Sequence, residues 1–165
     1  MLTETVEPRA LNLLLIEDED NDVLLFSVAL ERARLGIVLH TVADGQAGID
    51  YLSGTGIYAA RSVYPLPDVV VVDVRMPKVS GTEFLKWCRT SHTFADLPIA
   101  LLSGSCEGDR EILSAIALGA NRSFTKPSNL AEFVGLVRQI YSFGVECRSR
   151  RSVPGESNGY AKADH

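Results

Sequence analysis

Short apolar runs of strand length alternate along the chain with segments in which apolar residues recur every three or four positions. A short apolar run is typical of a buried strand, and the three-four spacing is typical of a helix with one face in the core. The predicted strands cover residues 11–16, 37–42, 69–72, 99–102 and 123–125. Strands that alternate with helices are typical of repeated βα units, so we expect one α/β domain: an open, doubly wound parallel sheet with helices on both faces.

Capping residues indicate where several predicted helices begin. Asp20 or Asn21 is expected to cap the first helix, and Asp44 the second. Ser80 and Glu83 have the spacing of a capping box for the third helix. The remaining predicted elements are a long flexible loop over residues 54–67, a fourth helix over 109–118 and a fifth helix after residue 128.

Polar side chains come directly after four of these strands. They are Glu17 and Asp18, Asp73, Ser103 and Lys126. Because the carboxyl ends of parallel strands lie side by side, we expect these groups to converge on one crevice. Three carboxylates would repel one another there unless a cation bound among them, and Mg²⁺ prefers such oxygen ligands. The sequence therefore predicts a site that binds Mg²⁺ and accepts a phosphoryl group.

Composition and charge exclude other classes of function. The chain has 165 residues, a net charge of −5 and a pI near 5.2, and its basic residues are scattered except in 148–151, so nucleic-acid binding is not predicted. Cys88, Cys106 and Cys147 show no CxxC spacing, which favours a reducing cytoplasm over a disulfide framework. No secretory signal is predicted, and no apolar run approaches the roughly 18 residues of a membrane helix.

The ends of the chain differ in composition from its middle. We expect a short extension over residues 1–10, the folded domain over 11–143 and a disordered tail over 144–165. The tail has no periodic apolar face, so it cannot bury enough apolar area to offset the entropy of ordering. Deleting the chain from Glu146 onward is therefore expected to leave thermal stability nearly unchanged.

With these residues in place, the segment from 11 to 142 resembles the receiver domain of bacterial two-component response regulators. The resemblance implies a flavodoxin-like strand order, 2-1-3-4-5. It implies that Asp73 is the phosphoacceptor and also a ligand of Mg²⁺. It further implies that Asp18 binds the metal directly, that Glu17 acts largely through water, and that the backbone carbonyl of Arg75 completes the protein ligands.

The same resemblance assigns the groups that contact the phosphoryl group. Ser103 matches the switch hydroxyl and Lys126 the phosphate-contacting lysine, and the bond before Pro127 is expected to be cis. One position departs from the family pattern, because Ser123 stands where an aromatic residue is common. Phe124 follows it and should point to the opposite face of the strand.

The resemblance also implies a function. We expect a single-domain response regulator that receives a phosphoryl group from a sensor histidine kinase or a phosphotransfer protein. Its activity as an enzyme is limited to its own phosphorylation and dephosphorylation. The long segment 53–67, with Tyr58, is similar to regulators associated with bacterial and cyanobacterial phytochromes, which makes a bacteriophytochrome a candidate kinase. Output is expected through contact with a partner protein or a second copy of the chain, with no nucleic acid and no membrane involved.

The residues argue against three alternative functions. An aspartate-nucleophile phosphatase has a second aspartate two positions after the nucleophile, where this chain has Arg75. A flavin-binding module has a hydroxyl-rich loop after the first strand, where this chain has four acidic residues from Glu17 to Asp20. Residues 54–59 fit the GxGxxA spacing of a dinucleotide site, but they follow a predicted helix instead of a strand. The phosphatase-like enzyme is kept as the alternative function.

Overall fold

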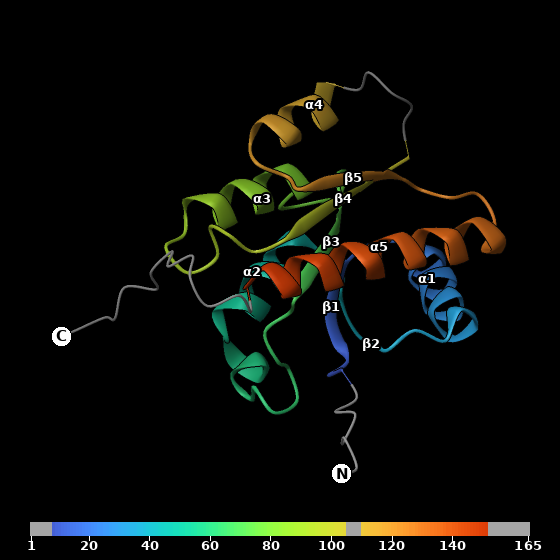
Figure 1. Ribbon diagram of the computed structural model, residues 1–165. Helices are drawn as coiled ribbons and strands as arrows, with labels where there is room; N and C mark the ends of the chain where they lie inside the picture. Colours follow the sequence, from blue (N-terminus) through green and yellow to red (C-terminus); the bar gives the residue numbers. More distant parts are fainter. Residues whose placement is uncertain (1–7, 105–109, 152–165) are drawn as a thin grey trace, which may run out of the picture.

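A computed structural model describes residues 8–104 and 110–151, and its five parallel strands form one sheet in the order β2-β1-β3-β4-β5 (Figure 1). The strands are β1 (Leu11–Ile16), β2 (Ile37–Val42), β3 (Val69–Asp73), β4 (Ile99–Ser103) and β5 (Arg122–Thr125). The helices are α1 (Asp20–Ala33), α2 (Gly45–Ser53), α3 (Gly81–Thr90), α4 (Arg110–Ala117) and α5 (Leu130–Arg151), with the 3-10 helix η1 (Gly56–Ala59). The predicted α/β class and strand order are confirmed. The expected helix start at residue 109, residues 1–7 of the extension, Cys106 and residues 152–165 lie outside the described chain.

Alternating side chains of the sheet divide the core in two. Along β3, Val69 and Val71 pack beneath α1 and α5, whereas Val70 and Val72 pack beneath α2 and α3. All four valines are inaccessible to solvent, as expected for a parallel strand that is covered on both faces (Figure 1). Because the strands are held from both sides, their carboxyl ends are fixed in position for the site described below.

Two of the predicted helix caps are observed. The side chains of Asp44 and Ser80 each accept a hydrogen bond from the backbone amide three residues later, at 2.7 and 3.2 Å. The prediction for α1 is wrong by one position, because Glu19 is the capping residue and Asp20 is already helical. The side chain of Glu19 makes no capping hydrogen bond. Acidic residues in the first turn still favour this helix through its dipole.

The segment between α2 and β3 is packed, although the sequence predicts a flexible loop. The rings of Tyr51, Tyr58 and Tyr64 lie with centroids 5.1 to 6.0 Å apart. The guanidinium group of Arg61 donates hydrogen bonds to the carbonyl oxygens of Tyr51, Leu52 and Tyr64. Gly and Pro residues in the sequence indicate a loop correctly, but they say nothing of these contacts.

The last helix corrects the predicted end of the domain. α5 continues to Arg151, beyond the expected boundary at residue 143. Cys147 packs against the core beneath α1 and α5. Arg148 donates a hydrogen bond to the carbonyl oxygen of Arg9 at 2.6 Å, and Arg151 donates one to that of Asp96 at 3.0 Å. These acceptors lie far away in the sequence, so apolar periodicity could not reveal them.

Among the described helices, none combines the length and apolar character of a membrane span.

This extension reverses the expectation for truncation. Deleting residues 146–165 should lower the melting temperature by about 5 °C, because roughly 1 kcal/mol or more of packing and hydrogen bonding is lost. Deleting only residues 152–165 is the matched control and should change it by less than about 2 °C. Circular dichroism during heating measures both. If the two truncated proteins melted at the same temperature, residues 146–151 would contribute no stability, and the predicted domain boundary at residue 143 would stand.

Candidate functional site

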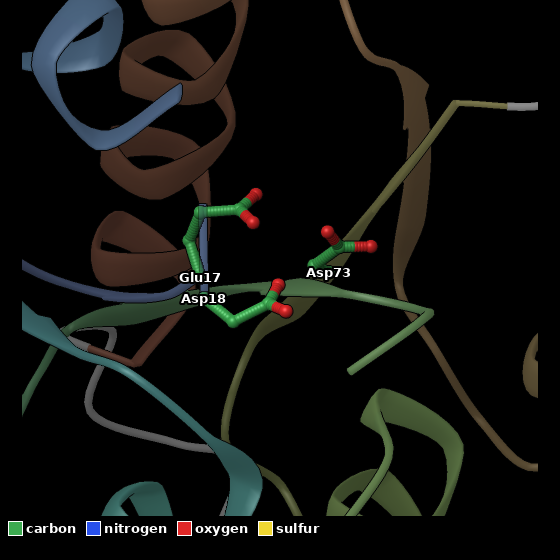
Figure 2. A group of neighbouring side chains, drawn as sticks. All are labelled: Glu17, Asp18 and Asp73. Carbon is green, nitrogen blue, oxygen red and sulfur yellow. The ribbon is translucent and has the colours of Figure 1, made fainter. Parts of the chain in front are cut away.

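Three carboxylates meet at the carboxyl ends of β1 and β3. The amide of Glu17 donates to Val42 of β2 at 3.1 Å, which fixes the chain at the end of β1. Asp73 is the last residue of β3, and its Oδ1 accepts a hydrogen bond from the amide of Arg75 at 3.0 Å. Carboxylate oxygens of Glu17, Asp18 and Asp73 all lie within 4.8 Å of one another (Figure 2). In Figure 2 the carboxylate of Asp18 points toward Asp73.

Lys126 brings the only described ammonium group into this cluster. Its Nζ lies 2.6 Å from Asp73, 2.8 Å from Asp22 and 3.0 Å from Glu17. Its backbone amide donates to the carbonyl oxygen of Ser103 at 2.7 Å, so the ends of β4 and β5 are joined next to the site. Five predicted residues, Glu17, Asp18, Asp73, Ser103 and Lys126, thus lie around one region of the fold.

Asp22 is the residue of this cluster that sequence reasoning missed. It lies in the first turn of α1, four positions after Asp18, where an acidic residue already has a reason to occur because of the helix dipole. The contact with Lys126 spans 104 positions of sequence. The one available signal was the run of acidic residues that continues from the end of β1 into α1.

Burial and charge together perturb the ionisable groups. Burial raises the pKa of Glu17 to about 7, and the charge of Asp73 adds to this, while the hydrogen bond with Lys126 opposes it. Burial alone lowers the pKa of Lys126, but hydrogen bonds with Asp22, Asp73 and Glu17 outweigh it, so the pKa is raised. Lys126 therefore stays protonated. With Asp18, the cluster contains four carboxyl groups and one ammonium group, and the excess negative charge favours a bound cation.

A crevice of about 340 Å³ opens beside this cluster. It is lined by Asp18, Glu19, Asp73, Arg75, Ser103, Gly104 and Lys126. The carboxylate oxygens are hard ligands, and their separation of up to 4.8 Å is close to the span of a cation with ligand distances of about 2.0–2.6 Å. The residues present therefore fit a divalent metal ion, and the remaining space fits a group of phosphoryl size.

Two expectations about β5 and the loop after it have different outcomes. The structure contains no cis peptide bond in its described residues, so the predicted cis bond before Pro127 is not observed. The trans form is the ordinary one for a bond to proline, favoured by about 0.5–1 kcal/mol. Ser123 lies opposite Leu101, whose side chain packs beneath α2 and α3. Phe124 packs beneath α1 and α5, on the other face, as predicted.

Comparison with known proteins adds to this geometry. A model of the response regulator receiver domain matches residues 13–138. The response regulator Rcp1 of Synechocystis sp. is 27% identical over 146 residues, which are 88% of this chain and 95% of that protein. A solved structure of Rcp1 is the Mn²⁺-bound form, and it superimposes with a TM-score of 0.70 at 26% identity over 82% of this chain and 95% of that one.

Two further solved structures are similar over most of the chain. One is response regulator RPA3017 in red light signaling of R. palustris, with a TM-score of 0.74 and 32% identity over 80% of this chain and 92% of that one. The other is the phosphorylated cyanobacterial phytochrome response regulator RcpA, with a TM-score of 0.74 and 29% identity over 88% of this chain and 99% of that one. The resemblance drawn from the motifs thus agrees with the comparison of whole chains.

Proposed function

Because this chain belongs to the response regulator receiver domain family, we propose that it accepts a phosphoryl group on Asp73 from a phosphohistidine, in a reaction that requires Mg²⁺. The donor is a sensor histidine kinase or a phosphotransfer protein. The observation that carries the proposal is the environment of the Asp73 carboxylate. One of its oxygens is held by the amide of Arg75 and the other by Lys126, at the wall of a crevice of phosphoryl size.

In the proposed transfer, an oxygen of Asp73 forms a bond to phosphorus while the bond from phosphorus to the donor imidazole breaks. The electron pair of the broken bond stays with the imidazole nitrogen. Lys126 offsets the charge on the phosphoryl oxygens, and the hydroxyl group of Ser103 donates to one of them. Two observations support these roles: Lys126 lies 2.6 Å from Asp73, and Ser103 lines the same crevice. The protein would thus contribute position and charge.

A metal ion would be held by Asp18, Asp73 and the backbone carbonyl of Arg75, with Glu17 acting largely through water. Bound Mg²⁺ would supply positive charge to the equatorial oxygens of the transferred group. The Mn²⁺-bound form of Rcp1 supports a divalent ion in this family, and the acidic cluster supports it in this chain.

The partners follow from the relatives. Rcp1, RcpA and RPA3017 are described as response regulators, RcpA of a cyanobacterial phytochrome and RPA3017 in red light signaling. We therefore propose a bacteriophytochrome histidine kinase as donor, acting in the cytoplasm. Movement of Ser103 toward the phosphoryl group would change the face formed by α4, β5 and α5, which a partner or a second copy reads. An aspartate-nucleophile phosphatase would have its general-acid aspartate at the position of Arg75. We therefore propose that enzymatic activity is limited to the phosphorylation and dephosphorylation of the protein itself.

The direct test of the proposed function is covalent labelling of the purified protein by a small phosphodonor. Labelling should appear with Mg²⁺, disappear when the metal is chelated and map to a peptide containing Asp73. Absence of labelling with Mg²⁺ from a donor that phosphorylates other receiver domains, or labelling that maps elsewhere, would contradict the proposal.

The metal ligands give a graded prediction. Asp18→Ala should weaken Mg²⁺ binding by about tenfold or more, equivalent to roughly 1.4 kcal/mol, because a direct ligand is lost. Glu17→Gln should weaken it less, because its contact with the metal is expected through water. A Mg²⁺ titration by calorimetry measures both variants against the unaltered protein. An equal effect, or the reverse order, would show that these two roles are misassigned.

A further inference from the structure

Asp22 shares Lys126 with the two predicted site residues Glu17 and Asp73. An ammonium group has three N–H donors. Three carboxylate oxygens already lie within 3.0 Å of the Lys126 ammonium, one from each of these residues. A phosphoryl oxygen that arrives on Asp73 needs one of these donors. Phosphorylation converts Asp73 into an acyl phosphate, so the carboxylates that still compete with the phosphoryl oxygens for Lys126 are those of Glu17 and Asp22.

Exposure indicates which carboxylate gives way. The side chain of Glu17 is 1% exposed and that of Asp73 is 7% exposed, whereas that of Asp22 is 26% exposed. Water can replace a lost partner at Asp22 more readily than at the buried Glu17, where an unpaired charge is costly. Asp22 also repels the phosphoryl group itself, which carries a charge of about −1.5 to −2.

Building on the proposed function, we propose that Asp22 is a positioning residue that opposes phosphorylation by holding Lys126 in its unphosphorylated arrangement. The contact also joins the first turn of α1 to the loop after β5. When Lys126 turns to the phosphoryl group, this link weakens, so α1 senses the state of the crevice. The strength of the pair between Asp22 and Lys126 thereby sets how readily the phosphorylated state forms.

The chain offers a matched control for this proposal. Asp20 lies in the same first turn of α1 and favours the helix dipole in the same way. Its side chain is exposed and makes no hydrogen bond or ion pair with the described residues. Asp20→Asn therefore removes a nearby charge and the helix contribution without touching Lys126. Any effect specific to Asp22 comes from its contact with that lysine.

The experiment measures the affinity for beryllofluoride, a phosphoryl mimic, at saturating Mg²⁺. The NMR signal of the Arg75 amide reports binding, since this amide donates to Asp73. Asp22→Asn and Asp22→Ala should both bind beryllofluoride about twofold to fivefold more tightly than the unaltered protein, the range for loss of a partly exposed charge pair. Asp20→Asn should differ by less than about twofold. General damage to the fold would weaken binding, so the expected direction separates the two effects.

Other outcomes would overturn the proposal. If Asp22→Asn matched the unaltered protein while Asp22→Ala bound more weakly, Asp22 would assist the phosphorylated state by orienting Lys126. If Asp20→Asn gained as much affinity as Asp22→Asn, general charge and not the contact would be responsible. If neither Asp22 variant changed affinity, the contact would have no effect on the equilibrium. Failure of the unaltered protein to bind beryllofluoride would instead overturn the proposed function, and this inference with it.

Discussion

Asp73→Asn should abolish covalent labelling by a small phosphodonor, to below about 1% of the unaltered protein, because an amide oxygen does not replace the carboxylate nucleophile. The substitution preserves the size of the side chain. The amide of Arg75, which donates to Oδ1 of Asp73, can still donate to the oxygen of asparagine. Circular dichroism should therefore show an intact fold. Labelling is measured by mass spectrometry of the intact chain with Mg²⁺ present.

Asp20→Asn provides the matched control for this substitution. It makes the same chemical change in an exposed residue close to the crevice, and labelling should be retained. Labelling of Asp73→Asn at the level of the unaltered protein would assign the acceptor elsewhere, with Asp18 the next carboxylate in the cluster. Loss of labelling in both variants would indicate a general dependence on negative charge near the site.

The sheet was predictable because its signals are local. Four consecutive valines before Asp73 are a pattern that suits a strand covered on both faces, and the structure buries all four. The positions of Glu17, Asp73 and Lys126 follow from the same signal, since each lies at the carboxyl end of a strand or directly after it, and parallel strands align these ends. The roles assigned to these residues came from the family resemblance and remain proposals.

Contacts between distant segments could not be predicted in this way. The pair between Asp22 and Lys126, the hydrogen bond from Arg148 to Arg9 and the packing of Arg61 around the tyrosines each depend on tertiary structure. In the sequence these residues look like an ordinary helix terminus, a basic tail and a polar loop. The last turns of α5 are held by Cys147 against the core and by hydrogen bonds from Arg148 and Arg151 to distant backbone carbonyls. These contacts produce no apolar period, which explains why α5 was predicted to end too early.

Gly81→Ala should destabilise the fold by about 2 kcal/mol or more, because the added methyl group would enter a space that is already filled. A Cβ atom on Gly81 would overlap the carbonyl oxygen of Asp73. The amide of Gly81 donates to Val74 at 3.2 Å, so the start of α3 is tied to the end of β3 and has little freedom to move away. Relief of the overlap would displace Asp73, so phosphorylation should slow as stability falls.

Gly135→Ala is the control with the opposite sign. Gly135 lies inside α5, and a Cβ atom there would meet nothing within 4 Å. Alanine favours a helix interior over glycine by about 1 kcal/mol, so this variant should be stabilised by roughly 0.5–1 kcal/mol with labelling unchanged. Urea unfolding measures both variants. If Gly81→Ala were as stable as the unaltered protein, α3 could shift without strain, and the close approach of its first residue to Asp73 would not be what holds the acceptor in place.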